Sequence, residues 1–199
     1  MPQNNLHMTA LEITHSLTAP EIHSLVEQMS SSKEQITNHT YDHRARLVKP
    51  SVSFDAQALA LSFLPAAGEE SQSERTSHDD AYTYHHLRRD LFALATEAGV
   101  TVASRYVVPS AHLTIGRFIE TSDFEVEHGG EGKIDGARVA ELVKVIEEIN
   151  EWLEREFWPI DGRIKEGGEW IVGEEKGLDF RQGALWYGGG ETVRLGKGF

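Results

Sequence analysis

Two tripeptides, His7-Met8-Thr9 (the first motif) and His112-Leu113-Thr114 (the second motif), place an imidazole and a hydroxyl two residues apart in apolar surroundings. Successive side chains of a β-strand point to opposite faces, so the His and the Thr of each motif share one face, about 7 Å apart along the strand. The central Met8 and Leu113 then face the core. If two such strands meet, two imidazoles lie across one small anionic group. One can take a proton from water while the other protonates a leaving oxygen.

The chain contains ten histidines, so a His-x-Ser/Thr pattern also arises by chance. The alternative is therefore a pair of histidines with structural roles only. Three features favour a paired site: both motifs lie in strand-like apolar runs (6–13 and 107–119), both contain Thr, and they are far enough apart to come from separate halves of a fold.

The eight residues of 111–118 (AHLTIGRF) resemble the second signature of the 2H phosphoesterase superfamily, which includes 2′-5′ RNA ligase-like and 2′,3′-cyclic nucleotide phosphodiesterase proteins. Residues 6–13 (LHMTALEI) resemble the first signature. The resemblance implies one bilobal domain over residues 1–199, with two lobes of antiparallel sheet and outer helices around a central cleft. The order of expected elements, with helices interrupting groups of strands, independently favours the α+β class.

We therefore expect a metal-independent phosphodiesterase acting on 2′,3′-cyclic or 2′-5′-linked nucleotides, on a free nucleotide or an RNA end. His7 and His112 would be the acid–base pair, since an imidazole ordinarily titrates near neutrality. Thr9 and Thr114 would donate hydrogen bonds to the nonbridging phosphate oxygens. This chemistry requires no cofactor. A nucleotide-binding module without turnover and an inactive fragment are the alternatives.

Other residues could assist this site. Arg117 would help to bind an anion, but strand alternation places it on the face opposite His112 unless Gly116 bulges, so we interpret it as structural. A nucleobase can stack on an aromatic ring. The candidates for this role are Tyr41, Tyr106, Trp186 and Tyr187, of which the last two are neighbours on one expected strand, so that at most one of them faces the substrate.

Composition restricts the class of protein. A net charge of −13 argues against an extended nucleic-acid surface, because such binding depends on many Lys and Arg contacts with phosphates. The absence of cysteine excludes disulfides and thiol catalysis. We find no apolar run long enough for a membrane span and no signal-peptide pattern at the N-terminus, so we expect an intracellular protein, cytoplasmic or nuclear. A metal site at 78–80 (HDD) is the less favoured interpretation, since these carboxylates also suit a helix N-terminus.

Members of the superfamily normally carry a strand and a helix ahead of the first motif, whereas six residues precede His7 here. We therefore expect an open sheet edge near His7. Unpaired strand edges recruit other chains. A homodimer, an aggregation-prone monomer, or a chain that is part of a longer gene product would follow.

The elements that must position the motifs follow from periodicity and capping signals. Helices are expected from Thr18 to about Ser30, from Ser77 or Asp80 to near Gly99, and from Asp135 to Pro159. Loops are expected at 31–38, 65–80 and 122–132, the second of them mobile. Strands are expected at 44–48, 51–54, 58–64, 100–108, 111–119, 169–172, 178–180, 184–187 and 192–195.

Overall fold

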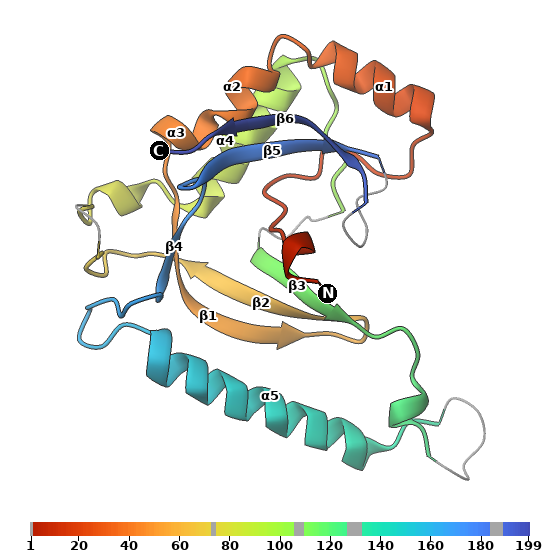
Figure 1. Ribbon diagram of the computed structural model, residues 1–199, viewed down its shortest axis with the longest axis vertical. Helices are drawn as coiled ribbons and strands as arrows, with labels where there is room; N and C mark the ends of the chain where they lie inside the picture. The colour runs from red at the N-terminus through yellow and green to blue at the C-terminus, as the bar shows by residue number, and fades with distance from the viewer. Residues whose placement is uncertain (1, 73–74, 106–109, 127–132, 184–188) are drawn as a thin grey trace.

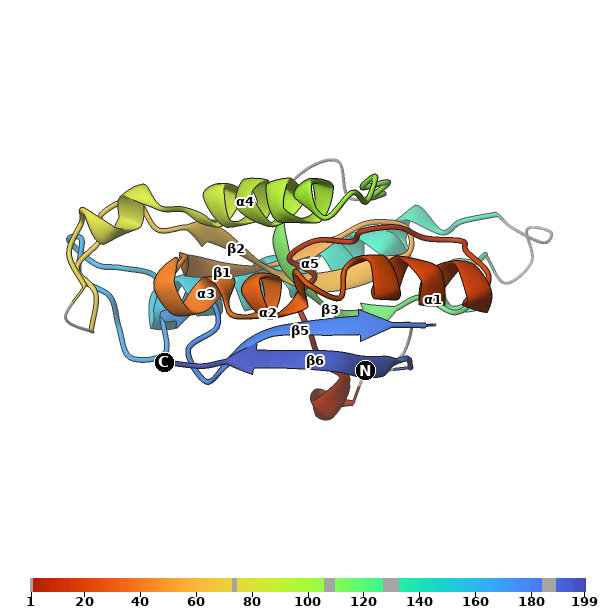
Figure 2. The ribbon, with the colours of Figure 1, turned by 90° about the horizontal axis from the view of Figure 1, so that it is seen from above.

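Two antiparallel sheets and five α-helices form the part of the chain that the computed structural model describes, residues 2–72, 75–105, 110–126, 133–183 and 189–199. The larger sheet has the strand order β3-β2-β1-β4, and β5 pairs with β6 in a separate sheet (Figures 1 and 2). This arrangement confirms the predicted α+β class. The strands are β1 (Arg46–Phe54), β2 (Ala58–Pro65), β3 (Ala111–Arg117), β4 (Glu169–Ile171), β5 (Lys176–Gln182) and β6 (Glu191–Lys197).

Three helices lie on either side of the larger sheet, with α5 below it and α1 and α4 above it in Figure 1. The predicted caps of two of them are confirmed. The Glu21 carboxylate accepts a hydrogen bond of 2.7 Å from the backbone N–H of Thr18 at the start of α1, and Asp135 accepts one of 2.9 Å from Ala137 at the start of α5. The helices are α1 (Ala19–Gln28), α2 (Lys33–Thr37), α3 (His39–Asp42), α4 (Tyr84–Glu97) and α5 (Gly136–Phe157).

Helix α4 begins later than the sequence predicted. Its first turn is capped by Thr83 and His86, whose Nδ1 accepts a hydrogen bond of 3.2 Å from the Thr83 N–H. The expected cap, Asp80, is instead buried beside Arg46, and it lies in a short 3₁₀ helix (Asp79–Ala81). The Asp80 carboxylate does not cap α4, because it accepts hydrogen bonds from the Arg46 guanidinium instead.

Arg46 ties the segment 65–80 to the larger sheet. It is 2% exposed, and it donates hydrogen bonds to both carboxylate oxygens of Asp80 (3.1 and 2.5 Å) and to Glu169 (2.8 Å). Ser71 and Gln72 also donate to Glu169. The described part of this segment is therefore a loop that a buried ion-pair network anchors, and its mobility stays a prediction.

Further predictions of local structure need correction. Residues 31–38 contain α2, where the Thr37 hydroxyl donates to the Lys33 carbonyl and Ile36 is buried in the core. The two strands expected at 44–48 and 51–54 are one strand, β1, with an irregular register between Val48 and Ser51. Residues 100–105 form no strand, while 106–109 and 184–187 of the remaining predicted strands lie outside the described residues.

Beyond the residues of β1 that pair with β4, side chains of α5 and of the residue after it make hydrogen bonds to the edge of β1. The Asn150 side chain accepts from the Val52 N–H at 2.6 Å and donates to the Val52 carbonyl at 3.0 Å, as a neighbouring strand would. Trp158 Nε1 donates to the Pro50 carbonyl. Side chains thus satisfy the backbone groups of this edge. Among the described residues, no helix is long and apolar enough to cross a bilayer.

The main core lies between α4, the α1–α2 region and one face of the larger sheet. Its fully buried members include Leu47 of β1 and Leu87 of α4. Met8 packs against this core from the first motif, as predicted from strand alternation. The core therefore fixes which face each motif presents on its other side.

Candidate functional site

The two motifs meet in the structure. Met8 and Leu113, their central residues, form an antiparallel β-bridge although they are far apart in the sequence. Residues directly opposite in an antiparallel pair have their side chains on the same face of the sheet. Extending this register by one residue on each side puts the His of each motif opposite the Thr of the other, on the face away from Met8 and Leu113.

This register sets the separation of the two imidazoles. Diagonal neighbours across an antiparallel pair lie about 7–8 Å apart at their backbones, within reach of long side chains. His7 and His112 are such diagonal neighbours in the register of the bridge. His7 is exposed and His112 is half-buried. Two imidazoles so placed can approach one phosphate from two sides.

The second motif is held by backbone pairing between β2 and β3, which is in regular register from Ala111 to Thr114. His112 pairs with Ser62, and Thr114 pairs with Ala60. The residues of β2 that alternate with these, at 59, 61 and 63, are Leu, Leu and Phe, and Phe63 packs against the main core. The strand thus has one apolar face toward the core and one face of small residues beside the motif.

The first motif does not lie in a strand of its own. Besides the Met8 bridge, its backbone is held by side chains of α4: the Tyr84 hydroxyl donates to the Thr9 carbonyl at 3.2 Å, and Arg88 Nη1 donates to the Ala10 carbonyl at 2.7 Å. The prediction of a full strand over 6–13 was therefore wrong. Helix α4 replaces most of the strand pairing that would otherwise fix this segment.

Local hydrogen bonds orient both imidazoles. Nδ1 of His7 lies 2.9 Å from the carbonyl oxygen of Asn5, which can only accept, so Nδ1 carries the proton and Nε2 of the neutral ring is the basic nitrogen. Nδ1 of His112 lies 2.9 Å from the Ser110 hydroxyl. In each case the partner is two residues before the histidine, on the same short segment.

Arg117 lies on the face of the second motif, contrary to the interpretation from sequence. The β2–β3 register shifts by one residue between the pairs Ala60–Thr114 and Leu59–Gly116, which leaves Ile115 as a bulge. Ala58, which shares a face with Ala60, pairs with Arg117. The bulge thus reverses the alternation after Thr114. Arg117 thus shares the face of His112 and Thr114, near the end of β3.

Sequence reasoning missed further polar groups on the same face. Ser62 lies opposite His112, and its hydroxyl is 2.6 Å from that of Ser53 on β1. The alternation of 58–63 (ALALSF), with small residues at every second position, is the sequence signal that could have revealed a face of small side chains beside the motif.

The predicted stacking residues are not brought to this face in the described structure. Tyr41 is 45% exposed on α3, which lies apart from β3 in Figures 1 and 2. Tyr106, Trp186 and Tyr187 lie outside the described residues. The less favoured metal site at 78–80 is also not formed, since no group of three or more His, Asp or Glu side chains within the described ranges could hold a metal ion.

Comparisons with protein-family models, with curated proteins and with solved structures found no match for this chain. The assignment of function therefore depends on the motifs and on their geometry.

Proposed function

We propose that this protein is a metal-independent phosphodiesterase of the 2H phosphoesterase type, acting on 2′,3′-cyclic or 2′-5′-linked nucleotides. The observation that carries the proposal is the Met8–Leu113 bridge. It joins two sequence motifs that were identified separately, and it supports a common face for both imidazoles and both threonine hydroxyls, which is part of the proposal.

In the proposed reaction, His7 is assigned as the general base and His112 as the general acid; the Nδ1–H of His7 is directed to the Asn5 carbonyl, which leaves Nε2 for proton transfer. Nε2 takes a proton from water as the water oxygen bonds to phosphorus. The bond from phosphorus to the 2′ or 3′ oxygen breaks, and protonated His112 donates a proton to that oxygen. Such general acid–base steps contribute about 10² to 10⁴-fold each.

Charge grows on the nonbridging phosphate oxygens during this displacement. The hydroxyls of Thr9 and Thr114 are proposed to donate hydrogen bonds to these oxygens, where fixed donors lower the barrier. Arg117 adds a guanidinium, which binds phosphate oxygens through strong charge-assisted hydrogen bonds.

The positive charge of Arg117 also lies near the carboxylate of Asp55. Two backbone hydrogen bonds from the β1–β2 turn, and then this positive charge, lower the Asp55 pKa.

The acidic chain limits the substrate to a nucleotide or an RNA end held at this face. A homodimer through the sheet edge beside His7 remains a prediction. In the described structure, the first motif lies along this edge, at the outer side of β3, through the single pair Met8–Leu113. Light scattering on the purified chain distinguishes a dimer from a monomer.

The test is a panel of 2′,3′-cyclic nucleotides and 2′-5′-linked dinucleotides, assayed for hydrolysis in excess chelator, beside a binding measurement with nucleoside monophosphates. We expect turnover that survives chelation and an optimum between roughly pH 5.5 and 7.5, since one imidazole must be neutral and the other protonated. Binding without turnover of any substrate would show a nucleotide-binding module instead. Loss of activity on chelation, restored by a divalent metal, would show a metal hydrolase.

A further inference from the structure

A pair of serine hydroxyls lies beside the second motif, on the face that carries His112. Ser62 of β2 is directly opposite His112, and residues so paired have Cβ atoms about 4.5–5.5 Å apart on one face of the sheet. Ser62 is half-buried, and its Oγ lies 2.6 Å from the Oγ of Ser53, which is exposed near the end of β1. The Ser62 hydroxyl is therefore a neighbour of the imidazole that is assigned as the general acid.

The order of the strands puts Ser62 and the first motif on opposite sides of His112. Strand β3 pairs with β2 along one edge, and it meets the first motif along the other edge through the Met8–Leu113 bridge. The proposed phosphate site lies between the two motifs. A substrate that continues from this phosphate past His112 therefore lies over β2, where Ser62 is the first side chain on that face.

The hydrogen bonds of these groups define what they can bind. Nδ1 of His112 lies 2.9 Å from the Ser110 hydroxyl, which leaves Nε2 to protonate a leaving oxygen. Either serine of the pair can be the donor in the Ser53–Ser62 hydrogen bond. When Ser53 donates, the hydrogen of Ser62 is available to a ligand, and when Ser62 donates, its oxygen can still accept. Another hydroxyl has the same two capacities, whereas a nonbridging phosphate oxygen only accepts.

We propose that Ser62 recognises the free 3′-hydroxyl of the leaving nucleoside and thereby favours 2′-5′-linked over 2′,3′-cyclic nucleotides; this inference rests on the proposed function. In a 2′-5′ linkage, the bond from phosphorus to the 2′ oxygen breaks and His112 donates a proton to this oxygen. The 3′-hydroxyl on the adjacent carbon is free, and it lies next to the leaving oxygen. In a 2′,3′-cyclic nucleotide both oxygens are bonded to phosphorus, so neither offers a hydrogen to Ser62.

The contact with Ser53 limits the size of this preference. A site rejects an analogue that lacks a hydroxyl by about 10⁴-fold or more when its own buried polar group is then left without a partner. Ser62 retains its hydrogen bond to Ser53 when the ligand hydroxyl is missing. The expected loss is that of one hydrogen bond between neutral groups, about twofold to tenfold.

The experiment compares the 2′-5′-linked dinucleotide of adenosine with the analogue whose leaving nucleoside is 3′-deoxyadenosine. It measures kcat/KM in excess chelator, and calorimetric affinity in the His112→Asn background, where hydrolysis is slow. The wild type should prefer the dinucleotide with the 3′-hydroxyl about twofold to tenfold. Ser62→Ala should lose this preference, and Ser62→Thr, which keeps a hydroxyl, should retain part of it. A merely structural role of Ser62 would lower the values for both dinucleotides equally.

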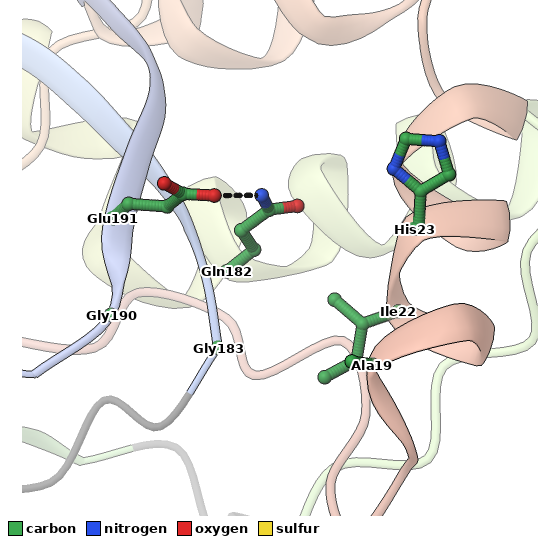
Figure 3. A pocket seen from close by; sticks show the side chains of 7 residues that line it. All are labelled: Ala19, Ile22, His23, Gln182, Gly183, Gly190 and Glu191. Atoms are coloured by element: carbon green, nitrogen blue, oxygen red, sulfur yellow. Dashed lines mark hydrogen bonds between the residues drawn. The ribbon is translucent and has the colours of Figure 1, made fainter.

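A hollow of about 490 Å³ between α1 and the ends of β5 and β6 supplies a control (Figure 3). The described residues that line it include His23 of α1 and none from β1, β2 or β3. A dinucleotide bound there would contact His23 and not Ser62. His23→Ala should therefore leave the preference for the 3′-hydroxyl unchanged. Ser24→Ala, at an exposed position on α1, is the matched serine control.

The outcomes separate this inference from the proposed function. Equal values for the two dinucleotides in the wild type, or a preference that Ser62→Ala retains, overturn the role of Ser62 and leave the phosphodiesterase intact. Failure of both dinucleotides to bind or to be hydrolysed also overturns this role, whether or not cyclic nucleotides are hydrolysed. A preference in affinity that Ser62→Ala abolishes, in a protein that hydrolyses nothing in the panel, supports the contact and overturns the proposed catalysis.

Discussion

The two His-x-Thr motifs contain the same chemical groups, yet the fold supports them in different ways. The second motif lies in β3, which pairs with β2 through six residue pairs. The first motif lies in an extended segment whose strand pairing consists of the Met8–Leu113 bridge. Side chains of α4 hold the backbone that follows it, through Tyr84 and Arg88.

This difference separates two ways of positioning a reactive group. A ladder of backbone hydrogen bonds fixes the second motif whatever the neighbouring side chains are. The first motif depends on two particular side chains, and the main core lies beneath them. We therefore expect the two motifs to be equal in chemistry and unequal in their sensitivity to distant substitutions.

The largest expected effect is the loss of either imidazole. His7→Asn and His112→Asn should each reduce kcat on 2′,3′-cyclic nucleotides by about 10² to 10⁴-fold, because each removes one proton-transfer group. Neither side chain is fully buried, so the fold should persist, as circular dichroism would check. Near-normal activity in either variant would refute the two-histidine mechanism.

Loss of a phosphate donor should have a smaller effect. Arg117→Met should reduce kcat by about 10²-fold, and Thr9→Val and Thr114→Val should each reduce it by less, since each removes one neutral donor. Thr101→Val, at an exposed position outside both motifs, is the matched control. If Arg117→Met behaves like this control, the bulge at Ile115 does not bring the guanidinium to the phosphate.

Removing a hydrogen bond that α4 makes to the first motif should show most clearly that the two motifs differ in their support. Tyr84→Phe deletes the hydrogen bond to the Thr9 carbonyl, and it should lower kcat several-fold and stability by about 1 kcal/mol. Ser62→Ala removes the side chain opposite His112 and should change kcat less, because the ladder still positions the second motif. Equal losses in the two variants, measured by steady-state kinetics and urea unfolding, would contradict the proposed difference in support.

The smallest expected effect concerns pH and His39. Burial, and then the ring of His43 stacked 4.3 Å away, lower the pKa of His39, against the opposing charge of Asp90. A histidine whose pKa is lower in the folded state stabilises the fold fully above its unfolded pKa, near 6.5, and loses this contribution as the pH falls. The free energy of unfolding should therefore fall less between pH 7.5 and 5.5 in His39→Gln than in the wild type. If the free energies of unfolding of the wild type and of His39→Gln fall by the same amount over this pH range, the prediction is contradicted.

Local signals in the sequence predicted what local interactions determine. The Thr18–Glu21 capping box and the Asp135 cap are made by residues two or three apart, and both are present in the structure. The alternation around His112 likewise gave the correct faces for the second motif.

Long-range partners determined what the sequence could not predict. Asp80 was expected to cap a helix, but it accepts hydrogen bonds from Arg46, which is 34 residues away in the sequence. The bulge that puts Arg117 on the motif face exists only in the pairing of β3 with β2. The stretch containing α2 has too few residues to show helical periodicity. The pairing of the two motifs was expected as a hypothesis from their resemblance, but its register appears only in the folded chain.

The central claim is that the two motifs act together on one phosphate. A double-mutant cycle tests it most directly, with His7→Asn, His112→Asn and the combined variant assayed on a 2′,3′-cyclic nucleotide in excess chelator. Groups that act as a unit are strongly non-additive. The account predicts that the combined variant is hardly slower than the slower single variant. Multiplied losses, or a single variant with near-normal activity, would contradict it.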